Sequence, residues 1–233
     1  MIQRVVAWHT DKGPIFGERQ MGFYDAWLFP RVLDLVMQQK QMIPFRERIG
    51  KTASGRVLDI GIGSGLNLPF YGEQADHVCG VDPSAELLKF AQERAHKAHV
   101  PVELLRGSGE ALPLDDKSID TVAMTFTLCS VNDPARTLME IRRVLKPGGV
   151  LRFAEHGRAP EVGVARWQDR LTPIWKRVAG GCHLNRKPDD LMQSAGFWIE
   201  SLETGYLKAP RAMGFVYSGS ARPGETLRAA VSI

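Results

Sequence analysis

One stretch of the sequence indicates the fold first: Val57-Leu58-Asp59-Ile60-Gly61-Ile62-Gly63-Ser64-Gly65. A short apolar run ends here in alternating glycines, the pattern of a buried strand that enters a tight turn. Glycines in such a turn permit positive φ and let the backbone approach a ligand closely. The stretch therefore predicts a strand followed by a ligand-binding turn.

The surrounding residues 56–155 alternate between strand-like and helix-like patterns. Strands are expected at residues 56–60, 77–82, 102–106, 119–126 and 150–154. Helices are expected to open at Pro83-Ser84 and after the N-cap Asp133. Repeated strand–helix–strand units with right-handed crossovers form a parallel sheet covered on both faces, with a ligand crevice at the carboxyl ends of its strands. The sequence thus predicts an α/β fold.

The segments outside this core predict further elements. Residues 20–50 are expected to be mostly helical, with Pro30 near a helix start. Residues 188–195 read as a helix, residues 198–203 and 213–218 as strands, and the end from Arg222 as a frayed tail. The chain is therefore divided into an N-terminal helical cap (1–50), a main domain (51–220) with a helical insertion at 158–187, and a polar tail (221–233).

The composition, 44% hydrophobic and 24% charged among 233 residues, is typical of a soluble globular domain. No apolar run reaches the length of about 18 residues that a membrane span needs, and the first residues lack the pattern of a secretory signal. The cysteines Cys79, Cys129 and Cys182 are widely spaced and odd in number, as reduced thiols are. No Cys-x-x-Cys pair or histidine-rich tract indicates zinc. These features predict a cytoplasmic protein without a metal site.

The net charge of +4 is concentrated in one segment. From Arg158 to Lys187, seven basic and two acidic residues give the segment +5 and leave −1 for the rest of the chain. A protein that coats nucleic acid carries a more uniform basic surface. The chain therefore combines a near-neutral body with one basic segment.

Two carboxylates after the first two strands indicate what the crevice binds. Asp59 faces the glycine turn, where it would repel a pyrophosphate but attract an ammonium or sulfonium group. The alternative is that Asp59 bonds the backbone N–H groups of its own loop. Asp82 closes the second strand, where an acidic side chain accepts both hydroxyls of a ribose; the alternative is that it caps the helix at Pro83. If the ribose lies at Asp82, residues 107–113 adjoin the adenine.

Five motifs in this order resemble those of the class I S-adenosylmethionine-dependent methyltransferases. They are Asp59-x-Gly61-x-Gly63-x-Gly65, Gly80-Val81-Asp82, Glu110-Ala111-Leu112-Pro113, Ser118-Ile119-Asp120 and Arg143-Val144-Leu145-Lys146-Pro147-Gly148-Gly149. Further stretches are similar to the methyltransferase-like family whose animal members are membrane-associated alkyl thiol methyltransferases: Phe23-Tyr24-Asp25, Leu128-Cys129-Ser130-Val131, Glu155-His156, Trp167-Gln168 and Gly181-Cys182-His183-Leu184-Asn185-Arg186. The chain departs from those animal members in lacking a hydrophobic N-terminal anchor.

The resemblance implies a Rossmann-like fold, with a seven-stranded, mostly parallel sheet and helices on both faces. It implies S-adenosyl-L-methionine as the cofactor. The implied cofactor-binding residues are Tyr24, Asp59, Gly61, Gly63, Gly65, Asn67, Asp82, Pro83, Ser108, Gly109, Glu110, Thr127 and Leu128. Ser108 stands where many class I enzymes place an aspartate against the adenine amino group, and its hydroxyl is a weaker acceptor.

The implied reaction is an in-line methyl transfer to a small, apolar acceptor, with a thiol favoured. A free thiol is mostly protonated at neutral pH, so a base would help, and His156 is the candidate catalytic residue. The alternative for His156 is a hydrogen bond within the strand end. Cys129 is interpreted as an apolar filler, and His183 as facing either the acceptor or solvent.

The basic insertion predicts a helix with Trp167, Leu171, Ile174, Trp175 and Val178 on one face, kinked or split at Pro173. It is interpreted as an acceptor lid, as an interfacial patch for an anionic membrane surface, or as a packed helix with a solvated face.

Other functions stay open at this point. Phospholipid headgroup N-methylation, quinone C-methylation and cofactor binding without catalysis are the alternatives, while no motif predicts a nucleic-acid substrate. The oligomeric state is left undecided.

Overall fold

The computed structural model describes residues 28–224 of the chain. Its helices are α1 (Phe29–Met37), α2 (Ile43–Thr52), α3 (Ala85–Ala95), α4 (Pro134–Val144), α5 (Val162–Val178), α6 (Pro188–Ser194) and α7 (Arg211–Gly214), with short 3-10 turns η2 (Lys40–Met42) and η3 (Leu68–Phe70). Its strands are β1 (Gly55–Ile60), β2 (Ala75–Asp82), β3 (Val102–Arg106), β4 (Ile119–Thr125), β5 (Leu145–His156), β6 (Phe197–Tyr206) and β7 (Phe215–Pro223).

The seven strands form one sheet in the order β3-β2-β1-β4-β5-β7-β6. The five strands from β3 to β5 are parallel, and β7 runs antiparallel to both of its neighbours. The predicted seven-stranded, mostly parallel, Rossmann-like sheet is confirmed. Strand order reverses between β1 and β4, so the ligand crevice of such a sheet is expected at the carboxyl ends of these two strands.

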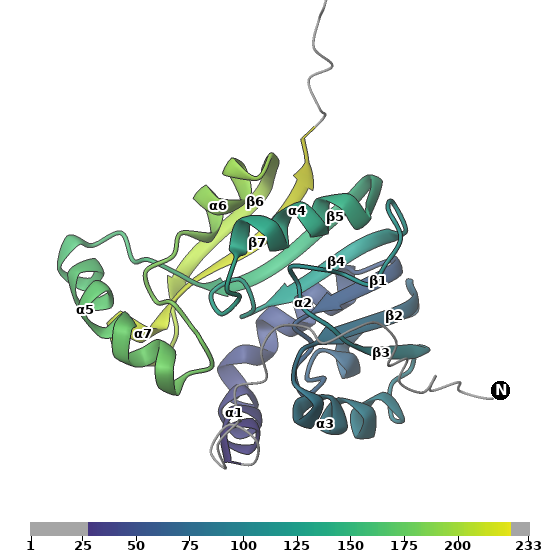
Figure 1. The fold of residues 1–233 in the computed structure, drawn as a ribbon, viewed down its shortest axis with the longest axis horizontal. Coiled ribbons are helices and arrows are strands. Elements are labelled where there is room, and N and C mark those ends of the chain that lie inside the picture. The colour runs from purple at the N-terminus through teal and green to yellow at the C-terminus, as the bar shows by residue number, and fades with distance from the viewer. Residues whose placement is uncertain (1–27, 225–233) are drawn as a thin grey trace, which may run out of the picture.

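The sheet separates the hydrophobic core into two layers. Leu58 and Ile60 of β1 point to one layer, which also contains Leu138 of α4. Val57 of β1 points to the other layer, together with Leu88 of α3. Alternate side chains of a strand point to opposite faces, so one buried strand supplies both layers. Figure 1 shows the helices distributed over the two faces of the sheet.

Two helices begin at side-chain caps, of which the sequence predicted Asp133 and not Ser84. The Ser84 hydroxyl accepts the N–H of Leu87 at 3.2 Å, and the Asp133 carboxylate accepts the N–H of Arg136 at 3.0 Å. Each cap satisfies a backbone donor that the first helical turn leaves free and contributes about 1 kcal/mol.

Several strand ends differ from the sequence prediction, and β5 and β7 show the cause. β5 begins at Leu145 instead of Val150, because Leu145 already pairs with Ile119 of β4. A register shift then separates this pair from the predicted strand at 150–154. The predicted fraying is wrong for Arg222 and Pro223, since both pair with β6 and the Arg222 guanidinium bonds Glu200 at 2.7 Å. Cross-strand pairing therefore holds the first residues of the expected tail.

Helix α5 corrects two expectations about the basic insertion. It is one unsplit helix across Pro173. Proline has no backbone N–H to donate to the carbonyl of Asp169, one turn earlier in the helix. Pro173 and Asp169 are both exposed, so water can donate to that carbonyl instead. The fully buried residues of α5 are Ala165, Gln168 and Thr172. Of the predicted apolar face, Leu171 and Trp175 are partly buried, whereas Trp167, Ile174 and Val178 are exposed. None of the helices within residues 28–224 has the length and apolar character required to cross a membrane.

Candidate active site

The turn after β1 places its three glycines in different surroundings, although all three have positive φ. A Cβ atom on Gly61 would lie 2.3 Å from the Thr127 hydroxyl oxygen, and one on Gly65 would lie 3.0 Å from the Cα atom of Ala91. A Cβ atom on Gly63 would meet only the Gly61 carbonyl oxygen, at 3.9 Å. The outer glycines are therefore needed for packing, whereas the surface over Gly63 is free of the described protein atoms.

Asp82 joins the glycine turn to the start of α3. One carboxylate oxygen accepts the N–H of Gly63 at 2.9 Å, and the other accepts the N–H of Ser84 at 2.8 Å. Burial raises the pKa of Asp82 to about 6. The helix cap itself is Ser84, so the alternative that Asp82 is the cap is wrong. Each oxygen keeps a lone pair for a further donor such as a ribose hydroxyl.

Asp59 is buried beneath the turn and bonds side chains. Its carboxylate accepts the hydroxyl of Tyr71 at 2.9 Å and the amide of Asn67 at 3.2 Å. Burial raises the pKa of Asp59 to about 7. The alternative that Asp59 bonds its own loop backbone is not observed among these contacts. Sequence reasoning missed Tyr71, whose only signal was a hydroxyl twelve residues after the aspartate.

The predicted adenine loop follows β3. The Ser108 hydroxyl donates to the Glu110 carboxylate, which in turn accepts the backbone N–H groups of Asn132 and Asp133 at 3.0 and 3.3 Å. This bond leaves the Ser108 oxygen as an acceptor, the role that an adenine amino group requires. Glu110 thereby connects the loop to the start of α4, and Gly109 packs close to Ile60.

The turn after β4 is held by Glu155. Its two carboxylate oxygens accept the backbone N–H groups of Thr127 at 2.8 Å and Cys129 at 3.2 Å. Glu155 is fully buried, and burial raises its pKa to about 7. The Thr127 hydroxyl also donates to the Ile60 carbonyl at 3.0 Å, which fixes the turn beside the end of β1. Glu155 was absent from the predicted site set, although it adjoins His156.

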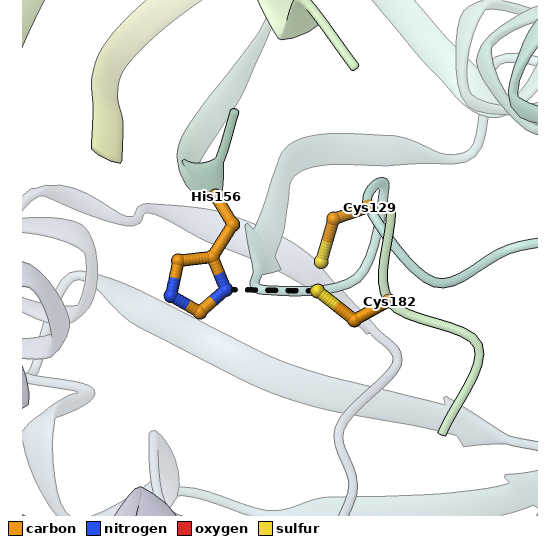
Figure 2. A group of neighbouring side chains, drawn as sticks. All are labelled: Cys129, His156 and Cys182. Carbon is orange, nitrogen blue, oxygen red and sulfur yellow. Dashed lines mark hydrogen bonds between the residues drawn. The ribbon is translucent and has the colours of Figure 1, made fainter. Parts of the chain in front are cut away.

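His156 lies at the end of β5 and is half-buried. Its ring packs on Phe126 with centroids 4.7 Å apart, and its Nδ1 atom lies 3.8 Å from the Cys182 sulfur. Cys129 completes the group, since the ligand atoms of Cys129, His156 and Cys182 all lie within 4.8 Å of one another (Figure 2). The structure therefore brings together three residues that sequence reasoning treated separately.

The insertion contacts this group through one of its two tryptophans. Trp175 packs against the cluster of Cys129, Cys182 and Leu184, whereas Trp167 is 57% exposed. His183 turns its Nδ1 atom to the Cys129 carbonyl at 3.3 Å. The predicted site residue Tyr24 lies outside the described residues.

Comparisons with known proteins address the family. Residues 58–153 match the family model described as a methyltransferase domain. The human thiol S-methyltransferase TMT1B is 38% identical over 168 residues, which cover 69% of this chain and 68% of the relative. The chain belongs to the S-adenosylmethionine-dependent methyltransferases.

The names of further relatives include both a thiol and a quinone acceptor. The rat thiol S-methyltransferase TMT1B is 39% identical over 63% of this chain, and the match spans 62% of the relative's length. The 2-phytyl-1,4-naphtoquinone methyltransferase of Synechocystis is 35% identical, with 69% of this chain and 73% of the relative covered. A methyltransferase structure from Thermotoga maritima superposes with a TM-score of 0.60 at 26% identity and covers 84% of this chain and 98% of its own.

The family membership supplies the cofactor, S-adenosyl-L-methionine. The residues present fit this molecule. The surface over Gly63 leaves room for it, and Asp82 bonds the Gly63 N–H beside that surface. Asp59 and Asp82 are buried carboxylates with raised pKa values that a nearby positive charge would lower.

Proposed function

We propose that this methyltransferase methylates the sulfur of a small, apolar thiol. The observation that carries the proposal is the identity of 38% to a thiol S-methyltransferase over about two thirds of both chains. The geometry around His156 supports it, because this imidazole at the end of β5 packs on Phe126 in the turn after β4, and Thr127 of that turn bonds the end of β1.

The cofactor is proposed to lie over the turn after β1. Asp82 would accept its ribose hydroxyls and Asp59 would favour its positively charged end. The remaining proposed contacts are Tyr24, Gly61, Gly63, Gly65, Asn67, Pro83, Ser108, Gly109, Glu110, Thr127 and Leu128. S-adenosylmethionine supplies an electrophilic methyl group on a sulfonium. The chain's own part is to align the acceptor and exclude water.

His156 is the proposed catalytic residue. Its Nδ1 atom faces the Cys182 sulfur, and the ring is held by packing on Phe126. The free imidazole would accept the thiol proton at Nε2, which raises the thiolate fraction of the acceptor at neutral pH.

Radiolabelled S-adenosylmethionine offered with an apolar thiol, a demethylated quinol or phosphatidylethanolamine tests the acceptor class. Labelled thioether from the thiol alone is the expected product. Labelled quinone alone would replace the thiol proposal by the second candidate, which the 35% identity to the quinone methyltransferase of Synechocystis favours. Cofactor binding without product from any acceptor would indicate a non-catalytic protein.

Helix α5 is proposed to contact the membrane surface from which an apolar acceptor would be taken. Its exposed apolar side chains Trp167, Ile174 and Val178 share the helix with the exposed Arg166 and Arg170. Such a combination fits peripheral contact with an anionic membrane surface in the cytoplasm, where an apolar acceptor would concentrate. Vesicles with and without anionic lipid test this contact by co-sedimentation, and equal binding to both would contradict it.

A further inference from the structure

Two thiols and one imidazole converge beside the proposed acceptor site. Cys129 follows β4, His156 ends β5, and Cys182 follows α5, so the three come from separate parts of the chain. Figure 2 shows the side chains pointing toward a common point, and their ligand atoms lie within 4.8 Å of one another. Cys129 and Cys182 are only 2% and 6% exposed, whereas His156 is half-buried.

Hydrogen bonds to the backbone hold the loops of Cys129 and Cys182 in this arrangement. The His183 N–H donates to the Cys129 carbonyl at 2.7 Å, which ties the two cysteine loops together. Glu155 accepts the Cys129 N–H, and the Arg186 guanidinium donates to the carbonyls of Leu128 and Val131 at 2.7 and 2.8 Å. Supports of this kind orient ligands before a metal arrives.

The donor set is suited to a soft cation. Two cysteine sulfurs and one imidazole nitrogen are ligands of zinc, which binds sulfur at about 2.3 Å and nitrogen at about 2.0 Å in tetrahedral sites. Ligand atoms around such an ion lie somewhat less than 4 Å apart, so the separation of 3.8 Å between His156 Nδ1 and Cys182 Sγ already matches. Small rotations of the Cys129 side chain would complete the site.

Zinc would bind the two thiols as thiolates. A metal ion displaces the protons of its cysteine ligands, so binding at Cys129 and Cys182 would release protons.

We propose that Cys129, His156 and Cys182 bind one zinc ion and leave one coordination position open. Within residues 28–224, the group contains no fourth histidine, cysteine or carboxylate. Three protein ligands with an open position are characteristic of catalytic rather than structural zinc. His156 is the most exposed of the three ligands, since it is half-buried whereas both cysteines are buried.

The open position would take the sulfur of the acceptor, a role that rests on the proposed function. The acceptor thiol binds zinc and releases its proton to solvent, with His156 now a ligand instead of the base. The acceptor sulfur then forms a bond to the methyl carbon as the bond from that carbon to the cofactor sulfonium breaks. The electron pair stays on the cofactor sulfur, and S-adenosylhomocysteine and a neutral, weakly bound thioether result.

Cobalt(II) titration of the metal-free full chain tests the site without an activity assay. One cobalt ion per chain is expected, with sulfur-to-cobalt charge transfer in the near ultraviolet and the strong visible bands of a tetrahedral site. Zinc should displace the cobalt. Absence of these bands, or bands that survive in Cys182→Ser, would overturn the proposal.

The third cysteine provides a matched control. Cys79 is as buried as the other two but lies within β2, so Cys79→Ala should keep the cobalt spectrum. Cys129→Ser, Cys182→Ser and His156→Ala should each weaken the cobalt affinity by about tenfold or more. Affinity for S-adenosylhomocysteine reports whether each variant is folded. If the metal-free chain instead loses 2 Da under air and regains it with a reductant, it behaves as a disulfide does. This result, together with no cobalt binding under reducing conditions, would identify Cys129 and Cys182 as a redox pair and overturn the metal site.

Activity separates this proposal from the proposed function. Zinc-loaded enzyme should methylate an apolar thiol at least tenfold faster than metal-free enzyme at neutral pH. Equal rates would contradict the role of zinc and leave thiol methylation standing. Cobalt binding with no thiol methylation would contradict the function and the acceptor role but leave the metal site standing.

Discussion

The two halves of the proposed active site are built in different ways. The cofactor half is one continuous turn, in which Gly61, Gly63 and Gly65 follow β1 and bond the end of β2 through Asp82. The acceptor half gathers Cys129 and Cys182 around His156 from three separate elements. A contiguous turn can be recognised from its spacing, whereas a site assembled across the sheet depends on every connection between its parts. Changes at Gly63 and Asp82 should therefore affect cofactor binding more than acceptor binding, and changes in the second half should affect the acceptor.

The largest expected effect is loss of cofactor binding in Gly63→Val. A β-branched side chain would occupy the free surface over the turn and resist the φ of 56°. The fold should survive with a cost of about 1–2 kcal/mol, because no described protein atom is in the way. Calorimetry with S-adenosylhomocysteine and thermal unfolding measure the two quantities.

Gly61→Val is the matched control for that variant. A Cβ atom at position 61 collides with the Thr127 side chain, so this change should unfold much of the protein. Normal cofactor affinity in Gly63→Val would show that the central glycine has only a structural role.

Trp175→Ala should lower the free energy of unfolding by about 3 kcal/mol, because this indole packs against the Cys129 and Cys182 cluster. It should also slow acceptor turnover while leaving affinity for S-adenosylhomocysteine within a few-fold. Chemical denaturation and thiol kinetics would test both points.

Trp167→Ala, on the same helix, should change stability by less than about 0.5 kcal/mol, because Trp167 is 57% exposed. Equal stability loss in the two variants would mean that the whole predicted stripe is packed. If Trp175→Ala also weakened cofactor binding in proportion, the cofactor half and the acceptor half of the site would not be independent.

Asp82→Ala should weaken binding of S-adenosylhomocysteine by about 1.5–3 kcal/mol, the cost of losing charge-assisted hydrogen bonds. The variant also frees the N–H groups of Gly63 and Ser84. Thiol binding should change little, which equilibrium dialysis with a labelled acceptor can measure. Unchanged affinity for S-adenosylhomocysteine would remove Asp82 from the site.

The smallest expected effect is a pH dependence of cofactor binding. Burial raises the pKa of Asp59 to about 7 from 3.8, so the folded free protein binds more protons than the unfolded chain between about pH 4 and 7. Stability of the free protein should therefore fall as the pH rises through this window. A bound ammonium favours the carboxylate, so the increase in melting temperature caused by S-adenosylhomocysteine should grow from pH 5 to pH 8.

Asp59→Asn should flatten that increase, since an amide does not titrate. If the increase in melting temperature still grew with pH in this variant, another group would be responsible. Asp82 would be the next candidate, because its pKa is raised to about 6.

Local pattern determined much of what the sequence could predict. The strand-turn pattern at 57–65, the cap Asp133 and the order of the motifs depend on neighbours a few residues apart, and the structure contains each of them. The mostly parallel sheet followed because strands separated by helices leave few topologies. The cofactor was implied by the resemblance of these short motifs to those of a known family.

Tertiary structure alone decided how distant polar groups meet. Apolar periodicity identified the tryptophan face of α5, yet Gln168, which is not part of that face, is buried because its amide bonds the backbone of Gly157 and Ala159. Tyr71 reaches Asp59 from the loop that leads to β2. The absence of a Cys-x-x-Cys pair led to the expectation of no metal site, but Cys182 and His156 are 26 residues apart and still adjacent. Spacing rules describe short loops, and here the sheet and α5 supply the proximity instead.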